Sequence, residues 1–235
     1  MKSNAELKAE AKEMLQGRWR ESILLALIPT LISLILSFVL IIAIAIPSYL
    51  LFRDNISQMV DSGNVSVNVD LGGGNSSGSI IGGLIAALFT AGISWTFLDV
   101  LRGRRMAIEP FRDVFRGFRS PYALGIIVIF IISYVFQTLW ALLFIIPGIV
   151  KSYAYSQAHN IFYDAYESTG QVPKYVDTIT ASRRLMDGYK GQLFILDLSF
   201  IGWHILAVMT LGIGYLWLNP YIYATKAAFY NNLPK

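Results

Sequence analysis

Three stretches of the chain share one pattern: "LQGRWRESILLAL" (Leu15–Leu27), "FRGFRSPYALGI" (Phe115–Ile126) and "MDGYKGQLFILDL" (Met186–Leu198). Each contains a glycine, then aromatic and basic residues, and then the beginning of a long apolar run. Such a repeated junction indicates an internal repeat, in which a short polar-faced segment ends and a longer hydrophobic segment begins. The expected fold depends on what the three apolar runs do.

The apolar runs are long enough to cross a membrane. Of the 235 residues, 55% are hydrophobic and 14% are charged, and the mean hydropathy is +0.54. No charged residue occurs in Ser22–Phe52, Ser79–Leu98 or Tyr122–Val150, and Gln192–Thr225 carries only Asp197. A helix needs about 20 apolar residues to cross a hydrocarbon core of about 30 Å. The composition therefore indicates an all-α integral membrane protein and excludes a soluble helical domain, whose helices would need polar faces.

The remaining composition narrows the class further. The first 21 residues mix five basic with four acidic residues, and the apolar run that follows exceeds the 7–15 residues of a signal peptide, so no cleavable signal is expected. The absence of cysteine excludes disulfides, thiolate catalysis and cysteine-based metal sites. Basic residues flank the apolar runs, where they orient membrane proteins, so no nucleic-acid partner is expected.

A short segment with helical spacing of apolar residues precedes each junction. Ser3 and Glu6 form a capping-box pattern at the start of the first segment. Gly17, Gly117 and Gly188 are expected to end these segments in the left-handed conformation that glycine adopts easily. Each segment is expected to be a short cytoplasmic amphipathic helix lying in the membrane interface. The apolar stripes are Leu7, Ala11, Met14 and Leu15; Phe111, Val114, Phe115 and Phe118; and Tyr175, Ile179, Leu185 and Met186.

The repeat predicts six transmembrane helices, arranged as three hairpins in one domain. If each junction lies on the cytoplasmic side, an outward helix and a returning helix must follow each one. The expected parts of the domain 1–235 are the N-terminal amphipathic helix at 1–21, hairpin 1 at 22–98 with an external loop at 53–78, an interfacial helix plus hairpin 2 at 106–166, and an interfacial helix plus hairpin 3 at 174–230.

The distribution of basic residues favours six crossings over five. The five-crossing alternative runs one helix over 122–150 and leaves the basic segment around Arg183 and Arg184 outside the cell. Six crossings leave only Arg53 and Lys151 outside, of the 19 Lys and Arg residues. Because Lys and Arg are enriched in cytoplasmic loops, six crossings with both termini in the cytoplasm are expected.

Asp197 is an acidic residue inside the predicted third hairpin. An ionisable residue within a membrane span suggests a functional site. Folding the hairpin about Leu211 places Asp197 at the depth of Ala224 to Lys226, so an intramembrane ion pair between Asp197 and Lys226 is predicted. The pair is expected to lock the two helices together; a ligand or proton site is the alternative.

The predicted fourth crossing carries polar residues at a spacing of four: Lys151, Tyr155, His159 and Tyr163. Polar side chains face lipid only at a large cost in free energy, so this helix is expected to be central or to line a hydrated cleft. A tyrosine-rich wall with Lys151 at the outer mouth is a candidate cleft for an anionic lipid headgroup or a peptide. Hydrogen bonding between helices, with no ligand, is the alternative.

Motifs for catalysis are absent from the sequence. It contains no phosphate-binding loop, no GxSxG, no HExxH and no paired intramembrane aspartates. Neither of the two histidines has a carboxylate at helical ligand spacing, so no metal and no cofactor are expected. The stretch "RGRRMAIEPFRDVFRGFR" (Arg102–Arg119) could attract anionic lipids, or could serve only to orient the chain.

Four stretches carry a resemblance to a known family: "LKAEAKEMLQGRW", "IIPGIVKSYAYSQA", "ASRRLMDGYKGQLFILDLSFIGWHIL" and "TLGIGYLWLNPYIYATKAAFY". They resemble the bacterial membrane family Domain of Unknown Function 975 over nearly the whole chain except the expected external loop. More loosely, the arrangement is similar to the membrane domain of some glycerophosphodiester phosphodiesterases, whose catalytic barrel has no counterpart here. The resemblance implies a multi-pass protein of the bacterial cytoplasmic membrane and supplies no catalytic residues.

Three hypotheses for function follow. The first is a non-enzymatic membrane protein that binds lipid or a hydrophobic peptide, or is an accessory to an envelope or transport complex. Its expected partners are membrane lipids, including anionic headgroups, and a hydrophobic peptide or membrane protein. The second is a transporter or channel with a path along the polar fourth helix, although parallel repeats are unlike the inverted repeats of many transporters. The third is an intramembrane lipid-modifying enzyme.

Overall fold

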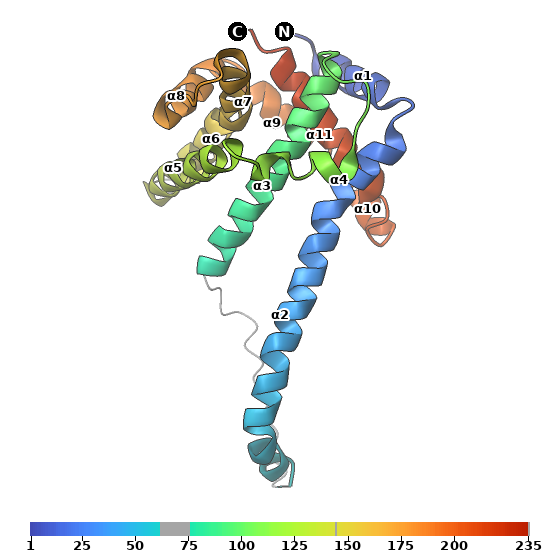
Figure 1. The fold of residues 1–235 in the computed structure, drawn as a ribbon, viewed down its shortest axis with the longest axis vertical. Helices are drawn as coiled ribbons and strands as arrows, with labels where there is room; N and C mark the ends of the chain where they lie inside the picture. The colour runs from blue at the N-terminus through green and yellow to red at the C-terminus, as the bar shows by residue number, and fades with distance from the viewer. Residues whose placement is uncertain (62–75, 144, 235) are drawn as a thin grey trace.

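The computed structural model describes residues 1–61, 76–143 and 145–234, which form helices and loops without a β-strand (Figure 1). The all-α fold class is confirmed. Residues 62–75, most of the expected external loop, lie outside the described residues. In chain order the elements are α1 (Asn4–Leu15), α2 (Trp19–Asp61), α3 (Ser76–Leu101), α4 (Pro110–Asp113), the 3₁₀ turn η1 (Arg116–Phe118), α5 (Tyr122–Leu143), α6 (Ile145–Tyr155), α7 (Ala158–Thr169), α8 (Tyr175–Leu185), α9 (Lys190–Leu198), α10 (Ile201–Met209) and α11 (Tyr215–Asn231).

Four segments of the described chain are long and apolar enough to cross a membrane: Trp19–Leu50, Ile80–Leu101, Tyr122–Leu142 and Lys190–Met209. These segments are consistent with a membrane protein. The other two expected crossings differ from them in structure. The predicted fourth crossing is divided into α6 and α7, and the sixth corresponds to the 17-residue helix α11, which is largely buried.

The long helix α2 extends away from the rest of the molecule (Figure 1). Its apolar side chains have little protein around them; Leu34 and Ile35, for example, are 62% and 65% exposed. Burying a leucine or isoleucine side chain contributes about 1.5–3 kcal/mol, so a helix this apolar is unfavourable in water. A lipid environment accounts for its surface.

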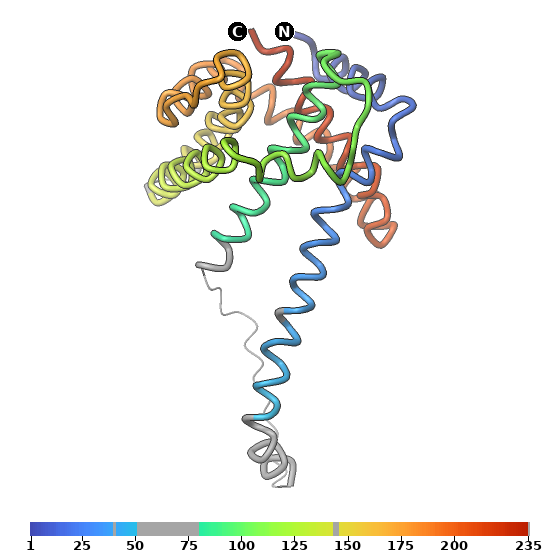
Figure 2. Tube along the Cα trace, in the orientation of Figure 1, coloured from blue at the N-terminus to red at the C-terminus, as the bar shows by residue number. Residues whose placement is uncertain are grey.

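Helices α3 and α11 pack against each other in the middle of the molecule. Trp95 of α3 and Phe229 of α11 are fully buried within the same hydrophobic cluster. The chain trace in Figure 2 shows the two termini at one end of the molecule, beside the C-terminal end of α3. The N-terminal helix α1 and the C-terminal end of α11 therefore lie at the same end of the molecule.

The apolar stripe of α1 faces the protein. Ser3 and Glu6 form the expected capping box, and Leu7, Ala11, Met14 and Leu15 are all buried. They pack in clusters with residues of α11, including Ala224, Ala227 and Phe229. The expectation that α1 turns its apolar side toward lipid is wrong, because α11 covers that side. Burial within the protein replaces burial in the membrane interface.

The second expected interfacial helix is two short turns, α4 and η1, instead of one helix. Val114 is buried between them, while Phe111, Phe115 and Phe118 are exposed. Gly117 is not in the left-handed region, so its expected role is wrong. It lies so close to α3 that a Cβ atom would collide with the carbonyl oxygen of Leu88. Glycine is needed there for close backbone approach.

The other two junction glycines have the expected backbone conformation. Gly17 has φ +75° and Gly188 has φ +80°, which L-residues with a side chain adopt only at a cost. Gly17 separates α1 from α2, and Gly188 lies between α8 and α9. At these two junctions the glycine allows one helix to end and the next to begin in a new direction.

Candidate binding site

A polar cavity of about 670 Å³ lies among α3, α6, α7, α9 and α11. Its wall combines hydroxyl, amide and charged side chains with a few apolar ones. Beside the cavity, the apolar side chains of Phe194 and Ile195 are exposed on the outer face of α9. The lining residues are Thr90, Ser94, Ile149, Ser152, Tyr153, Ser156, Gln157, Asn160, Leu193, Asp197, Asn219, Ile222, Tyr223 and Lys226. We refer to this set as the polar cavity.

Asp197 and Lys226 form an ion pair in the wall of the polar cavity. Lys226 Nζ lies 2.9 Å from Asp197 Oδ1, and the hydroxyl of Tyr153 donates to Asp197 Oδ2 at 3.2 Å. The side chains of Asp197 and Lys226 are 29% and 44% exposed, so both reach the cavity space. The structure brings together the two residues that hairpin geometry paired in the sequence, and adds Tyr153 from α6.

A chain of side-chain hydrogen bonds forms another part of the wall. Ser94 Oγ donates to Asn160 Oδ1 at 3.0 Å, and Asn160 Nδ2 donates to Gln157 Oε1 at 3.1 Å. Gln157 Nε2 then donates to Ser156 Oγ at 3.0 Å. Gln157 and Asn160 are buried. Because buried amides are favourable only when hydrogen-bonded, this chain fixes their orientation and presents polar edges to the cavity.

Two residues of this wall, Ser156 and Gln157, lie in the break between α6 and α7. Helical hydrogen bonding is interrupted around Ser156 and Gln157, and Ser182 of α8 fills the gap. The hydroxyl of Ser182 donates to Ala154 O at 2.8 Å and accepts from Gln157 N at 3.2 Å. Ser182 is fully buried, so one side chain satisfies two backbone groups that the broken helix leaves open.

The same packing changes the expected position of Lys151. Helix α8 lies along the second hairpin, and Arg183 and Arg184 line a cavity of about 300 Å³ together with Lys151. The sequence placed Lys151 outside and Arg183 inside, separated by a hydrocarbon core of about 30 Å. The expected separation of Lys151 from Arg183 is therefore wrong, because α8 packs along α6 and α7 and brings the two side chains to one cavity.

The four residues of the candidate cleft do not form one surface. Tyr155 packs in an apolar cluster with Phe162 and Ile179, and Tyr163 packs in another with Trp95. Lys151 lies over the Trp140 ring, 4.6 Å from its centroid. The expected cleft is therefore wrong in its residues, because the helix break rotates α7 relative to α6. The cavity lies instead along Ser152, Tyr153, Ser156, Gln157 and Asn160.

His159 has one unusual feature among the residues of this segment. Its Nε2 atom is buried and makes no hydrogen bond with any residue that the structure describes. Its backbone carbonyl accepts from Trp95 Nε1 at 3.3 Å. Within the described ranges, no three His, Asp or Glu side chains are grouped closely enough to hold a metal ion.

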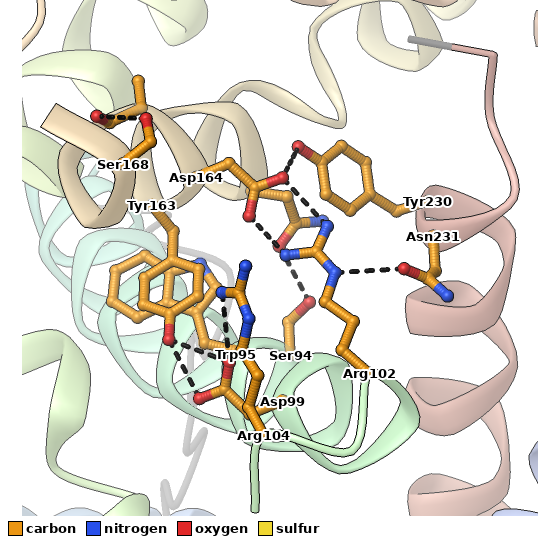
Figure 3. Close-up of polar contacts among 12 residues, drawn as sticks. Ser94, Trp95, Asp99, Arg102, Arg104, Tyr163, Asp164, Ser168, Tyr230 and Asn231 are labelled. Atoms are coloured by element: carbon orange, nitrogen blue, oxygen red, sulfur yellow. Dashed lines mark hydrogen bonds and ion pairs between the residues drawn. The ribbon is translucent and has the colours of Figure 1, made fainter.

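A buried charged cluster lies next to the polar cavity, toward the end of α3. Arg116 Nη2 is 2.8 Å from Asp99 Oδ2. Figure 3 shows Tyr163 beside Asp99, with the Tyr163 hydroxyl 2.9 Å from both carboxylate oxygens. Trp95 stacks on Tyr163 with ring centroids 4.8 Å apart. Asp99 is 3% exposed and Tyr163 is 2% exposed. This cluster ties η1 and α7 to α3.

A second charged cluster lies just past the end of α3, at Arg102. Arg102 binds Asp164 through two hydrogen bonds, Nη1–Oδ1 at 2.5 Å and Nη2–Oδ2 at 2.9 Å (Figure 3). The Tyr230 hydroxyl donates to Asp164 Oδ2 at 2.9 Å, and Arg102 Nε donates to Asn231 Oδ1 at 3.0 Å. The hydrogen bond to Asp164 raises the pKa of Arg102 above its ordinary value. Three elements far apart in sequence meet here.

This second cluster borders the largest of the cavities described here, of about 1080 Å³, between α7, α8 and the end of α11. Arg104 and Arg184 supply positive charge to its wall, and Glu167 and Asp177 supply negative charge. The sequence placed Arg104 and Arg184 among the basic residues that orient the chain, and no role was predicted for Glu167 or Asp177. A usable signal was the i, i+3 spacing of Asp99 and Arg102 at the end of an uncharged run, which puts both on one side of α3.

Comparisons with known proteins give one match. The family described as "Protein of unknown function (DUF975)" matches residues 1–151 and 144–235, which together cover the chain. No curated protein matches the chain, and no solved structure matches it. The looser similarity to the membrane domain of glycerophosphodiester phosphodiesterases is therefore not shown.

Proposed function

Because the chain belongs to the DUF975 family, whose function is unknown, we propose a role from its geometry: a non-enzymatic membrane protein that binds the polar part of an amphiphilic molecule in the polar cavity. The ligand is a membrane lipid headgroup or the polar part of a hydrophobic peptide. The protein acts by itself or as an accessory to an envelope or transport complex of the bacterial cytoplasmic membrane.

The observation that carries this proposal is the combination of an ion pair and amide groups in one cavity among apolar helices. Asp197 and Lys226 offer one negative and one positive charge 2.9 Å apart. Gln157, Asn160 and Asn219 line the same space and offer donors and acceptors. A group that carries both charges, or an amide that both donates and accepts, matches this wall. Polar and charged side chains inside an apolar helix bundle are otherwise costly.

Among the described residues around the polar cavity, no nucleophile is hydrogen-bonded to a free base, which supports a binding role over catalysis. Asp197 is already paired with Lys226 and Tyr153, and Ser94 already donates to Asn160. A nucleophile needs an adjacent base that is free to take its proton. Asp197, Lys226, Tyr153, Ser94 and Asn160 are thus arranged as partners of one another, which suits recognition.

The test is retention of a ligand by the purified protein. Native mass spectrometry of protein extracted from its own membrane is expected to show a bound lipid or peptide. The Asn219→Leu and Tyr223→Phe variants, which each remove one polar group from the cavity wall, should lower its occupancy severalfold. Tyr49→Phe is the matched control, because Tyr49 is 64% exposed on α2 and lies away from the cavity.

Added phosphatidylethanolamine and an added hydrophobic peptide distinguish the two ligand classes. If the added lipid displaces the retained molecule from the wild-type protein, the ligand is a lipid headgroup. If the added peptide displaces it, the ligand is a hydrophobic peptide. Equal retention in the wild-type and both cavity variants, or no retained molecule in any preparation, would contradict the proposal.

A transport role is the second candidate, and one observation favours it. Helix α7 contributes Asn160 to the polar cavity and Asp164 to the cavity of about 1080 Å³. The stacked pair of Trp95 and Tyr163 belongs to the buried core beside them. If this pair is a gate, Trp95→Ala should increase solute flux into liposomes, whereas a binding protein should show no flux in either form.

The proposal includes an orientation in which both termini and the basic segments are cytoplasmic. Six crossings, as expected from the sequence, require α6–α7 and α11 to cross in addition to the four candidate spans. Lys151 and Arg183 line the same cavity. This favours instead a second hairpin that enters the membrane and returns to the same side without crossing it. Labelling of single cysteine substitutions from outside the cell distinguishes these arrangements.

A further inference from the structure

An apolar groove of about 500 Å³ lies where α1, the beginning of α2, α10 and the beginning of α11 meet. Three of the five tryptophans of the chain line it: Trp19, Trp203 and Trp217. Trp203 and Trp217 are 55% and 51% exposed, so the groove is open at its surface. We refer to it as the tryptophan groove. It shares no lining residue with the polar cavity.

Apart from Lys12 and the tryptophan indoles, the polar side chains that line the tryptophan groove are hydrogen-bonded within the protein. Thr210, which lines it, donates to Ala207 O at 2.8 Å and accepts from Gly214 N at 2.8 Å, so its hydroxyl is satisfied within the protein. Tyr221 donates to the backbone of Lys8 at 3.4 Å. Leu206, Ala207 and Leu218 complete the wall. An apolar chain fits this interior, and a polar solute does not.

Lys12 is the only charged residue among those that line the tryptophan groove. Its helix α1 precedes the first candidate span, which begins at Trp19, whereas Trp203 and Leu206 belong to the last candidate span, Lys190–Met209. The groove therefore joins a positive charge on α1 to apolar side chains of a candidate span. Lys12 is exposed, and it forms no ion pair with another described residue.

We propose that the tryptophan groove binds one molecule of an anionic phospholipid, with its phosphate on Lys12 and an acyl chain along the tryptophans. The charge supports an anionic lipid, because a single cation with no acidic neighbour in the wall complements a net negative headgroup. The tryptophans support a lipid over a soluble ligand, because their amphipathic rings are favoured where headgroups meet hydrocarbon. This site does not depend on the role of the polar cavity.

Tryptophan quenching by brominated lipids tests the proposal. The protein is reconstituted in phosphatidylcholine nanodiscs that contain rising fractions of brominated phosphatidylglycerol or brominated phosphatidylcholine. Bromine quenches tryptophans in contact with the labelled acyl chain. Brominated phosphatidylglycerol should reach half-maximal quenching at a roughly fivefold lower fraction than brominated phosphatidylcholine, as expected for one lysine near an anionic headgroup.

Variants then assign the preference to the groove. Lys12→Gln should bring the two half-quenching fractions to the same value, and Lys12→Arg should preserve their difference. Lys174→Gln, at an exposed position before α8, is the matched control and should behave as the wild-type protein does. Trp203→Ala with Trp217→Ala should remove most of the selective quenching. Equal quenching by both lipids in the wild-type protein, or an unchanged preference in Lys12→Gln, would overturn the proposal.

Discussion

Lys226 Nζ lies 2.9 Å from Asp197 Oδ1, and this contact joins α11 to α9 at the wall of the polar cavity. Tyr153 of α6 bonds to the same carboxylate at 3.2 Å, so three helices meet at one side chain. The pair is partly exposed to the cavity, which allows it both to hold the helices together and to contact a ligand. Its contribution to stability can be measured separately from binding.

Removal of either partner of this pair should destabilise the protein. Asp197→Asn and Lys226→Met are each expected to lower the free energy of unfolding by about 1–3 kcal/mol, as for hydrogen bonds to charged groups. The double variant should lose less than the sum, with a coupling of about 0.5–2 kcal/mol. Unfolding in detergent measures these values. Asp187→Asn is the control, because Asp187 is 83% exposed in its pair with Lys190 and such pairs contribute little. Strictly additive losses would show that the contact has no energetic role.

The bidentate contact of Arg102 with Asp164 should contribute more. The Arg102 side chain is 12% exposed and the Asp164 side chain 21% exposed, so Arg102→Met is expected to cost about 2–4 kcal/mol. Arg102→Lys should recover only part of this, because lysine keeps the charge but cannot form the two parallel bonds. Arg104→Gln is the matched control, since its side chain is 51% exposed and 3.9 Å from Asp99. Thermal unfolding that ranks Arg104→Gln above Arg102→Met in cost would contradict this assignment.

Contacts within one hairpin could be predicted from the sequence, and contacts between hairpins could not. The pairing of Asp197 with Lys226 follows from one turn near Leu211, because the turn fixes which residues share a depth. Arg102 and Asp164 are 62 residues apart and lie in different parts of the repeat, so no local rule brings them together. The cluster of Asp99 with Arg116 and Tyr163 was missed for the same reason.

Patterns of apolar residues also predicted which helix faces are covered, but they did not predict whether lipid or protein covers them. The stripe of α1, with Leu7 and Leu15, is buried as expected of an amphipathic helix. Its cover is α11, more than two hundred residues away in the sequence, and periodicity does not distinguish lipid from protein. In the fourth predicted crossing, residues spaced by four share one face only if the helix is unbroken. The hydroxyl of Ser182 stabilises a break there, which no local pattern indicated.

Gly117 should tolerate substitution least among the junction glycines. In Gly117→Ala the new Cβ would collide with the Leu88 carbonyl oxygen, a backbone atom that cannot move independently of α3. We expect a loss of more than about 3 kcal/mol, or failure to fold. Gly17→Ala meets nothing within 4 Å but has φ +75°, so it should cost only about 1–2 kcal/mol. Gly191→Ala, with open space around it and no left-handed backbone, is the neutral control. Yield and thermal stability in detergent give the order, and a harmless Gly117→Ala would contradict the close approach of η1 to α3.

The orientation of the chain can be read by labelling single cysteines, because the sequence contains no native cysteine. Arg104→Cys and Arg183→Cys are expected to resist a membrane-impermeant maleimide applied to intact cells and to react after the cells are opened. Lys151→Cys decides the second hairpin. Lys151 lines a cavity of about 300 Å³ with Arg183 and Arg184, so the two positions should be labelled from the same side. Labelling of position 151 from outside, with position 183 protected, would restore six crossings and would contradict the packing of α8 along α6. Arg53→Cys, expected outside from the sequence, is the positive control for external labelling.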